Sequence, residues 1–146
     1  MKPITKYPGN KIITIPHPIE LPNKSVWSTP EKTISKQLQR QLSRKTFLAV
    51  GRLKKVKNFP LLLRAFQIAS EEIEAHLVLL GDGQELENLQ QLANELQIAD
   101  RVHFMGFIEQ CTPYYQLADT FVLSSDSEGF GNVIVEALMN GCTVVS

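Results

Sequence analysis

The sequence predicts an α/β fold built on a Rossmann-like, doubly wound parallel sheet. Residues 47–50 are apolar throughout, and the run 76–80 is apolar after His76, which is typical of strands that are buried on both faces. Amphipathic helical patterns separate these runs, so strands and helices alternate along the chain. Because crossovers between parallel strands are right-handed, the helices are expected to cover both faces of the sheet.

Each expected strand is a short apolar or alternating run that glycine, proline or polar residues bound. These runs are residues 11–15, 47–50, 76–80, 101–105, 120–123 and 143–145.

The expected helices are marked by their start signals and apolar stripes. One begins after Thr29, with Pro30 in its first position, and extends to about residue 43. A second begins at residues 58–60 and packs through Leu62, Ala65, Phe66 and Ala69. A third carries Leu86, Leu89, Ala93 and Leu96, and two short helices cover residues 113–117 and 132–139.

The chain divides into two parts by composition. Residues 1–45 read as an interdomain linker segment and a leading helix, because residues 20–30 are polar and rich in proline. Residues 46–146 read as the Rossmann-like domain. Its last predicted strand ends next to the final residue, so we expect the domain to be incomplete at its C-terminus.

Composition excludes several classes of protein. Lys plus Arg and Asp plus Glu both number 15, so the basic excess of a nucleic-acid binder is missing. No apolar run is long enough to cross a bilayer, and the N-terminus lacks the apolar core of a signal peptide. Cys111 and Cys142 have no metal-ligand spacing. We therefore expect a cytoplasmic protein without a bound metal.

A basic loop follows the strand at residues 47–50. It contains Arg52, Lys54, Lys55 and Lys57. Ligands of open parallel sheets bind at the carboxyl ends of the strands, and arginine can donate two hydrogen bonds to a phosphate. A solvated loop would show the same charges. We favour phosphate binding, with Arg52 and Lys57 as ligands and the other two lysines facing solvent.

Two glutamates frame a Gly-x-Gly turn at residues 128–136. Gly129 and Gly131 permit close approach of the backbone, and the N-terminus of the helix that follows favours an anion. Either Glu128 or Glu136 alone would suit a solvated surface position. Together, beside this turn, they suit hydroxyl groups of a phosphorylated sugar.

Two further segments lie at the same edge. The turn at residues 81–83 lacks the third glycine of a dinucleotide fingerprint, so it reads first as a tight turn. Phe107 and Ile108 follow the strand at residues 101–105. Their apolar side chains suit either contact with the flank of a nucleotide base or packing in the core.

Four motifs now occur in order: 50–57, 78–83, 102–106 and 124–138. Together they resemble the C-terminal, donor-binding domain of retaining GT-B glycosyltransferases of family 4, the glycosyl transferases group 1 set. The two glutamates match the family's Glu-x7-Glu motif. The resemblance covers roughly residues 11–146.

The resemblance implies a role for each residue. Arg52 and Lys57 would neutralise the donor diphosphate, and Glu128 would contact the transferred sugar as the third catalytic residue. Glu136 would hold the ribose hydroxyls. The implied substrate-binding residues are Gly51, Phe107, Ile108, Phe130, Gly131, Asn132 and Glu136.

The resemblance also implies the reaction. The donor would be a UDP-sugar or GDP-sugar, and transfer would retain anomeric configuration without a metal or other cofactor. The acceptor, a saccharide or a lipid-linked molecule in polysaccharide or glycolipid synthesis, would bind an N-terminal domain that this chain lacks. The protein would be cytoplasmic or peripheral at the cytoplasmic face of the membrane. This chain alone would be inactive.

Two other functions remain open. One is a non-catalytic module that binds a sugar nucleotide, and the other is a GT-B-like nucleotide-sugar epimerase. All four charged residues of the motifs are present, which weighs against a decayed module. Fold alone does not decide among these functions.

Overall fold

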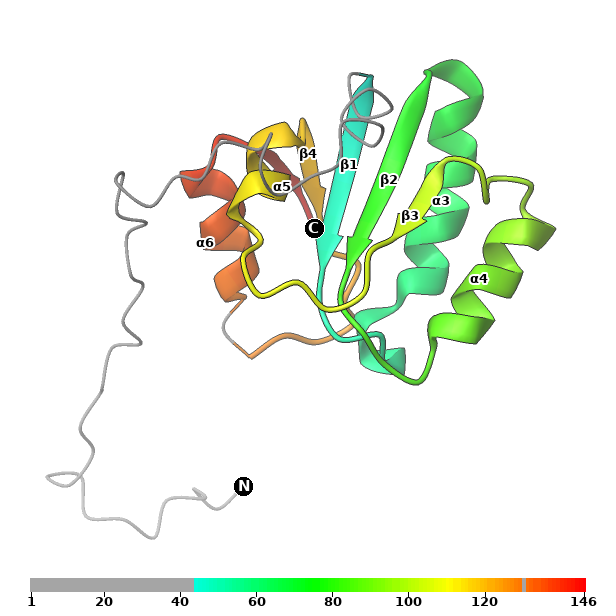
Figure 1. The fold of residues 1–146 in the computed structure, drawn as a ribbon, viewed down its shortest axis with the longest axis horizontal. Helices are drawn as coiled ribbons and strands as arrows, with labels where there is room; N and C mark the ends of the chain where they lie inside the picture. Colours follow the sequence, from blue (N-terminus) through cyan, green and yellow to red (C-terminus); the bar gives the residue numbers. More distant parts are fainter. Residues whose placement is uncertain (1–43, 130) are drawn as a thin grey trace, which may run out of the picture.

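A computed structural model of the chain describes residues 44–129 and 131–146. The strands in these residues form one five-stranded, parallel sheet in the order β3-β2-β1-β4-β5 (Figure 1). They are β1 (Lys45–Val50), β2 (Ala75–Leu80), β3 (Val102–Phe104), β4 (Thr120–Val122) and β5 (Thr143–Val145). The expected doubly wound α/β fold is confirmed.

Helices cover both faces of this sheet. On one side lie α3 (Phe59–Glu72) and α4 (Leu86–Glu95); on the other lie α5 (Thr112–Leu117) and α6 (Asn132–Met139) (Figure 1). A short 3-10 turn, η3 (Lys55–Lys57), precedes α3. This two-sided cover explains why all six residues of β2 are buried.

Successive side chains of β2 enter two different cores. Leu77 and Leu79 pack against α3 and α4, whereas Val78 and Leu80 pack against α5 and α6. The second core also holds the rings of Tyr115 and Phe121, whose centroids lie 5.8 Å apart. Both helical layers therefore pack against the same strands, and this close packing holds the loops at the strand ends in place.

Several expected boundaries move by one or two residues. β1 begins at Lys45, because the Asp119 side chain accepts hydrogen bonds from the Thr46 amide (2.9 Å) and the Lys45 ammonium (3.1 Å). The expected strand at residues 101–105 is assigned only over Val102–Phe104. Backbone hydrogen bonds still tie Arg101 and Met105 to β2, so this difference concerns only the strand ends.

Two expectations about packed helix faces are wrong. In α3, Ala65 is exposed, and the helix instead buries Leu63 and Ser70 beside Leu62 and Phe66. The Ser70 hydroxyl donates to the Gln67 carbonyl at 2.9 Å, so its burial leaves that donor satisfied.

In α6, Ala137 is fully buried but Leu138 is 58% exposed. The helical spacing of Val133, Ile134, Ala137 and Leu138 predicts that Leu138 shares the packed side of the helix. One further residue along a helix rotates a side chain by roughly 100°, which carries Leu138 past the sheet-facing stripe.

Some sequence-based expectations lie outside the described residues. They are the strand at 11–15, the loop at 20–30, the helix that ends near residue 43, and Phe130. The proposed division at residues 45 and 46 is therefore untested.

Candidate donor-binding site

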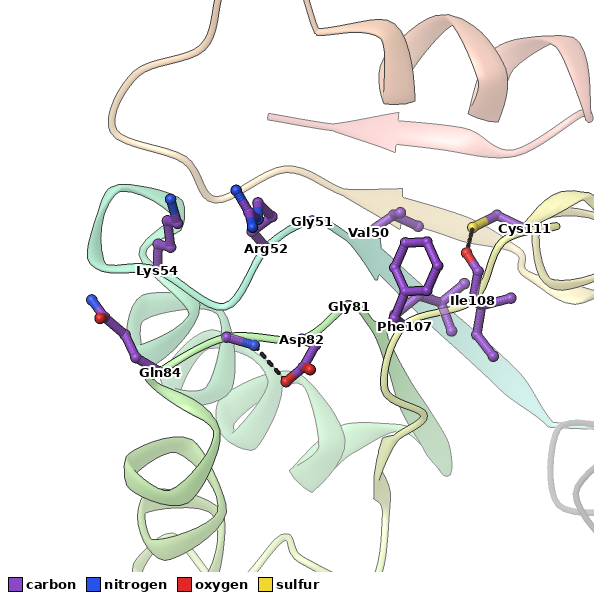
Figure 2. Close-up of a pocket in the computed structure, with 12 residues that line it drawn as sticks. Val50, Gly51, Arg52, Lys54, Gly81, Asp82, Gln84, Phe107, Ile108 and Cys111 are labelled. Atoms are coloured by element: carbon purple, nitrogen blue, oxygen red, sulfur yellow. Dashed lines mark hydrogen bonds between the residues drawn. The ribbon is translucent and has the colours of Figure 1, made fainter.

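A cavity of about 730 Å³ lies where the loops after β1, β2 and β3 meet (Figure 2). This is the carboxyl edge of the sheet, where open α/β folds bind their ligands. The residues that line it come from these loops and the strand ends: Val50, Gly51, Arg52, Lys54, Leu80, Gly81, Asp82, Gly83, Gln84, Phe107, Ile108 and Cys111.

Glycines allow the first two loops to pack backbone against backbone. A Cβ atom on Gly81 would lie 1.9 Å from the Gly51 carbonyl oxygen, and one on Gly83 would lie 2.4 Å from that of Leu53. The Leu53 amide donates to the Asp82 carbonyl at 2.9 Å, and the Gly81 amide to the Gly106 carbonyl at 2.7 Å. The turn at residues 81–83 is thus a structural part of the cavity wall.

Two cations of the basic loop line the cavity. Figure 2 shows the Arg52 and Lys54 side chains pointing the same way from the loop after β1. Within the described part of the chain, neither side chain has an ion pair or hydrogen bond. Their charges are therefore available to an anion in the cavity.

The third cation predicted from this loop is paired differently. The Lys57 ammonium donates to the Glu128 carboxylate, which also accepts from the Ser125 hydroxyl at 2.6 Å. The Lys57 hydrogen bond, followed by that of Ser125, holds the pKa of Glu128 below its ordinary value. The two residues lie 71 positions apart in the sequence but share one ion pair.

Hydrogen bonds between two loops explain how Lys57 and Glu128 meet. The Ser124 hydroxyl donates to the Lys57 carbonyl at 2.8 Å, and the Asp126 amide donates to the Val56 carbonyl at 3.0 Å. The stem of Lys57 also lies beside the cavity, because a Cβ on Gly51 would be 3.4 Å from Lys57 Cε. The ion pair therefore borders the cavity wall.

The other end of the cavity is apolar. Phe107 is 77% exposed although its ring is large and apolar, so it does not belong to the core. Ile108 and Cys111 pack partly against the second core and also line the cavity (Figure 2). Burial, and then the charge of Glu136, raises the pKa of the Cys111 thiol to about 11.

The second glutamate of the motif lies on α6. Its Oε2 accepts a hydrogen bond from the Tyr115 hydroxyl at 3.1 Å. Gly131 precedes α6 with a left-handed backbone (φ 68°), which suits glycine. In the described residues, Asn132 Oδ1 is buried without a hydrogen-bond partner.

The predicted site residues thus fall into two groups. Gly51, Arg52, Phe107 and Ile108 line the cavity itself. The other described ones do not line it: Lys57, Glu128, Gly131, Asn132 and Glu136. The Lys57 side chain lies beside Gly51, and the charge of Glu136 raises the pKa of Cys111; Gly51 and Cys111 both line the cavity.

Several lining residues were not predicted from the sequence. Lys54 was expected to face solvent, and no role was assigned to Gln84 or Cys111. Lys54 and Gln84 both lie in a loop that follows a strand, and this was the signal in the sequence that they could be near the site. That position alone does not show where a side chain points.

Two features are absent from the described residues. No group of three or more His, Cys, Asp or Glu side chains among them is arranged to hold a metal ion. None of their helices is long and apolar enough to cross a membrane.

The family described as glycosyl transferases group 1 matches residues 30–146. The chain belongs to this family. The uncharacterized glycosyltransferase of Haemophilus influenzae is 32% identical over 142 residues, which are 97% of this chain and 37% of that protein. The alpha-monoglucosyldiacylglycerol synthase of Streptococcus pneumoniae is 36% identical over 118 residues, and the match covers 79% of this chain and 27% of that protein.

Solved glycosyltransferases have the same arrangement. Anabaena Alr3699/HepE in complex with UDP matches with a TM-score of 0.68 at 28% identity, over 75% of this chain and 32% of that one. The pneumococcal O-GlcNAc transferase GtfA, in complex with UDP and GlcNAc, matches with a TM-score of 0.65 at 26% identity, over 68% of this chain and 20% of that one. The fold is that of one part of a GT-B glycosyltransferase, and the chain spans about a third of its curated relatives' length.

Proposed function

We propose that this domain binds the nucleoside diphosphate of a sugar donor, UDP or GDP, in the cavity at the ends of β1 and β2. One observation carries the proposal: the cavity has two cations at one end that are unpaired within the described residues, and an exposed aromatic ring at the other end. A diphosphate suits Arg52 and Lys54, and a base suits Phe107 and Ile108. The UDP complexes of HepE and GtfA support this assignment.

The remaining motif residues would serve the transferred sugar and the ribose. Glu128 would accept hydrogen bonds from sugar hydroxyls, and the first amides of α6, at Gly131 and Asn132, would face the diphosphate. The Lys57 ammonium has three N–H donors, so it can keep its hydrogen bond to Glu128 and still donate one to a phosphate oxygen. Glu136 would bind the ribose hydroxyls.

The proposed reaction is retaining hexosyl transfer by attack on the same face as the leaving group. The bond from the sugar's anomeric carbon to the phosphate oxygen breaks, and a bond to the acceptor oxygen forms. The leaving phosphate takes the acceptor's proton, so no side chain acts as a nucleophile. Arg52 and Lys57 would stabilise the negative charge that grows on the leaving diphosphate, in place of a metal or other cofactor.

We propose this activity for a longer protein that contains the domain, because the chain spans about a third of its relatives. The acceptor would be a saccharide or a lipid-linked molecule at the cytoplasmic face of the membrane. Relatives named for lipopolysaccharide core biosynthesis and for a glucosyldiacylglycerol support that class of acceptor.

Calorimetric titration of the protein with UDP, GDP and ADP, each with and without EDTA, tests the proposal. We expect UDP or GDP to bind equally well in EDTA. Arg52→Ala removes charged hydrogen bonds and should weaken binding roughly 10- to 100-fold.

Arg64→Ala is the matched control. Arg64 is an exposed arginine on α3 that does not line the cavity, so its loss should leave affinity unchanged. Failure of all three nucleotides to bind a folded sample would overturn the proposal. Equal losses in the two arginine variants would show a general charge effect instead.

A further inference from the structure

We infer that Tyr115 is a positioning residue, whose hydroxyl holds the Glu136 carboxylate in the orientation that receives the ribose of the donor. The inference rests on the proposed function, because it assigns a second residue to the ribose end of that site. Tyr115 belongs to α5 and to none of the four motifs.

The contact joins a buried side chain to an exposed one. Tyr115 is 2% exposed and packs against Phe121, while the Cys142 thiol donates to its backbone carbonyl at 3.1 Å. Glu136 lies on the exposed side of α6, and its side chain would otherwise rotate freely. The hydrogen bond of 3.1 Å from Tyr115 Oη to Glu136 Oε2 ties that side chain to the core.

The geometry leaves Glu136 able to bind a ligand. A carboxylate has two oxygens and accepts several hydrogen bonds, so fixing Oε2 leaves Oε1 for ribose hydroxyls. Burial, and then the negative charge of Glu136, raises the pKa of Tyr115. The hydroxyl therefore stays protonated at neutral pH and can only donate to the carboxylate.

The adjacent tyrosine provides a matched comparison. Tyr114 is 4% exposed and lies on the same helix, but its hydroxyl has no hydrogen bond to any residue that the structure describes. A tyrosine-to-phenylalanine change at either position keeps the ring and removes only the oxygen. A difference between the two variants therefore reports the contact with Glu136.

The test compares binding of UDP with binding of 2′,3′-dideoxy-UDP, which lacks both ribose hydroxyls. Calorimetry would be applied to the parent protein, Tyr115→Phe, Tyr114→Phe, Glu136→Ala and the double variant of Tyr115 and Glu136. Thermal unfolding without nucleotide would verify that each variant is folded.

We expect Tyr115→Phe to weaken UDP binding about tenfold, the scale of one hydrogen bond, and to leave dideoxy-UDP binding unchanged. Tyr114→Phe should change neither. In the Glu136→Ala background, the Tyr115 change should have no further effect, because the group that it positions is gone.

The outcomes separate the inference from the proposal on which it rests. If the parent binds neither UDP nor GDP, the proposed function fails and the inference fails with it. If it binds only GDP, GDP and its 2′,3′-dideoxy form take the place of the uridine nucleotides in the same comparison. If Glu136→Ala removes the preference for UDP but Tyr115→Phe retains it, only the inference is wrong. Equal losses for UDP and dideoxy-UDP in Tyr115→Phe would also overturn it, because they would show a purely structural role.

Discussion

Replacing Gly81 with alanine would test whether the cavity wall depends on close backbone contact. The new Cβ would lie 1.9 Å from the Gly51 carbonyl oxygen, whereas ordinary contacts begin at 3.4 Å. The two loops would have to move apart by about 1.5 Å. The atoms in the way belong to the backbone of a packed structure, so they cannot be displaced as easily as the end of a flexible side chain. The φ of Gly81, 139°, is a second obstacle for alanine.

The expected loss of stability follows from these two effects. Overpacking of a well-packed site costs about 1–3 kcal/mol, and a strained backbone conformation adds a similar amount. We therefore expect Gly81→Ala to lower the free energy of unfolding by about 3 kcal/mol. Urea denaturation followed by circular dichroism would measure this value.

Two other glycines calibrate the measurement. Gly141 has φ 87° but nothing within 4 Å of a new Cβ, so Gly141→Ala should cost only the backbone strain, about 1 kcal/mol. Gly129 has neither obstacle, so Gly129→Ala should change stability by less than about 0.5 kcal/mol. A Gly81→Ala variant as stable as Gly129→Ala would refute the close contact.

Two further predictions concern ionisable groups at the site. Lys57→Met should raise the pKa of Glu128 toward its ordinary value; an NMR titration that finds the same pKa in parent and variant would contradict the ion pair. Because that pKa is lowered in the fold, Glu128 contributes stability above its ordinary value of 4.5, and the contribution is lost as pH falls through the lowered value. Cys111 should react slowly with iodoacetamide at pH 8, with a rate that rises about tenfold per pH unit up to a pKa of about 11. UDP should protect it, since it lines the cavity; unchanged labelling in saturating UDP would contradict that.

The sequence predicted the fold well because the strands are apolar on both faces. β5 has the expected bounds, and β2 begins one residue earlier than expected. α6 also has the expected bounds, since Gly131 and Gly141 flank it. The stripe of α3 was less predictable. Ala65 and Leu63 are both apolar, and only the sheet decides which of them is covered.

The site was predicted by position but not by orientation. The sequence located the basic loop at the carboxyl edge, yet four cations in six residues do not reveal which side chains turn inward. Lys54 lines the cavity because backbone hydrogen bonds fix its loop to residues 82 and 85. Lys57 reaches Glu128 because hydrogen bonds join the two loops that carry them. Such contacts join distant segments, and one sequence does not record them.

The strand order also bears on how the chain folds. β1 lies at the centre of the sheet, with β2 on one side and β4 on the other. Pairing β1 with β2 closes only the loop that contains α3, whereas pairing β1 with β4 closes a loop through three helices and two strands. Loop closure costs more entropy as the loop lengthens, so the half with α3 and α4 should form first. The ion pair of Lys57 with Glu128 bridges the two halves, and it should therefore form in the last stage of folding.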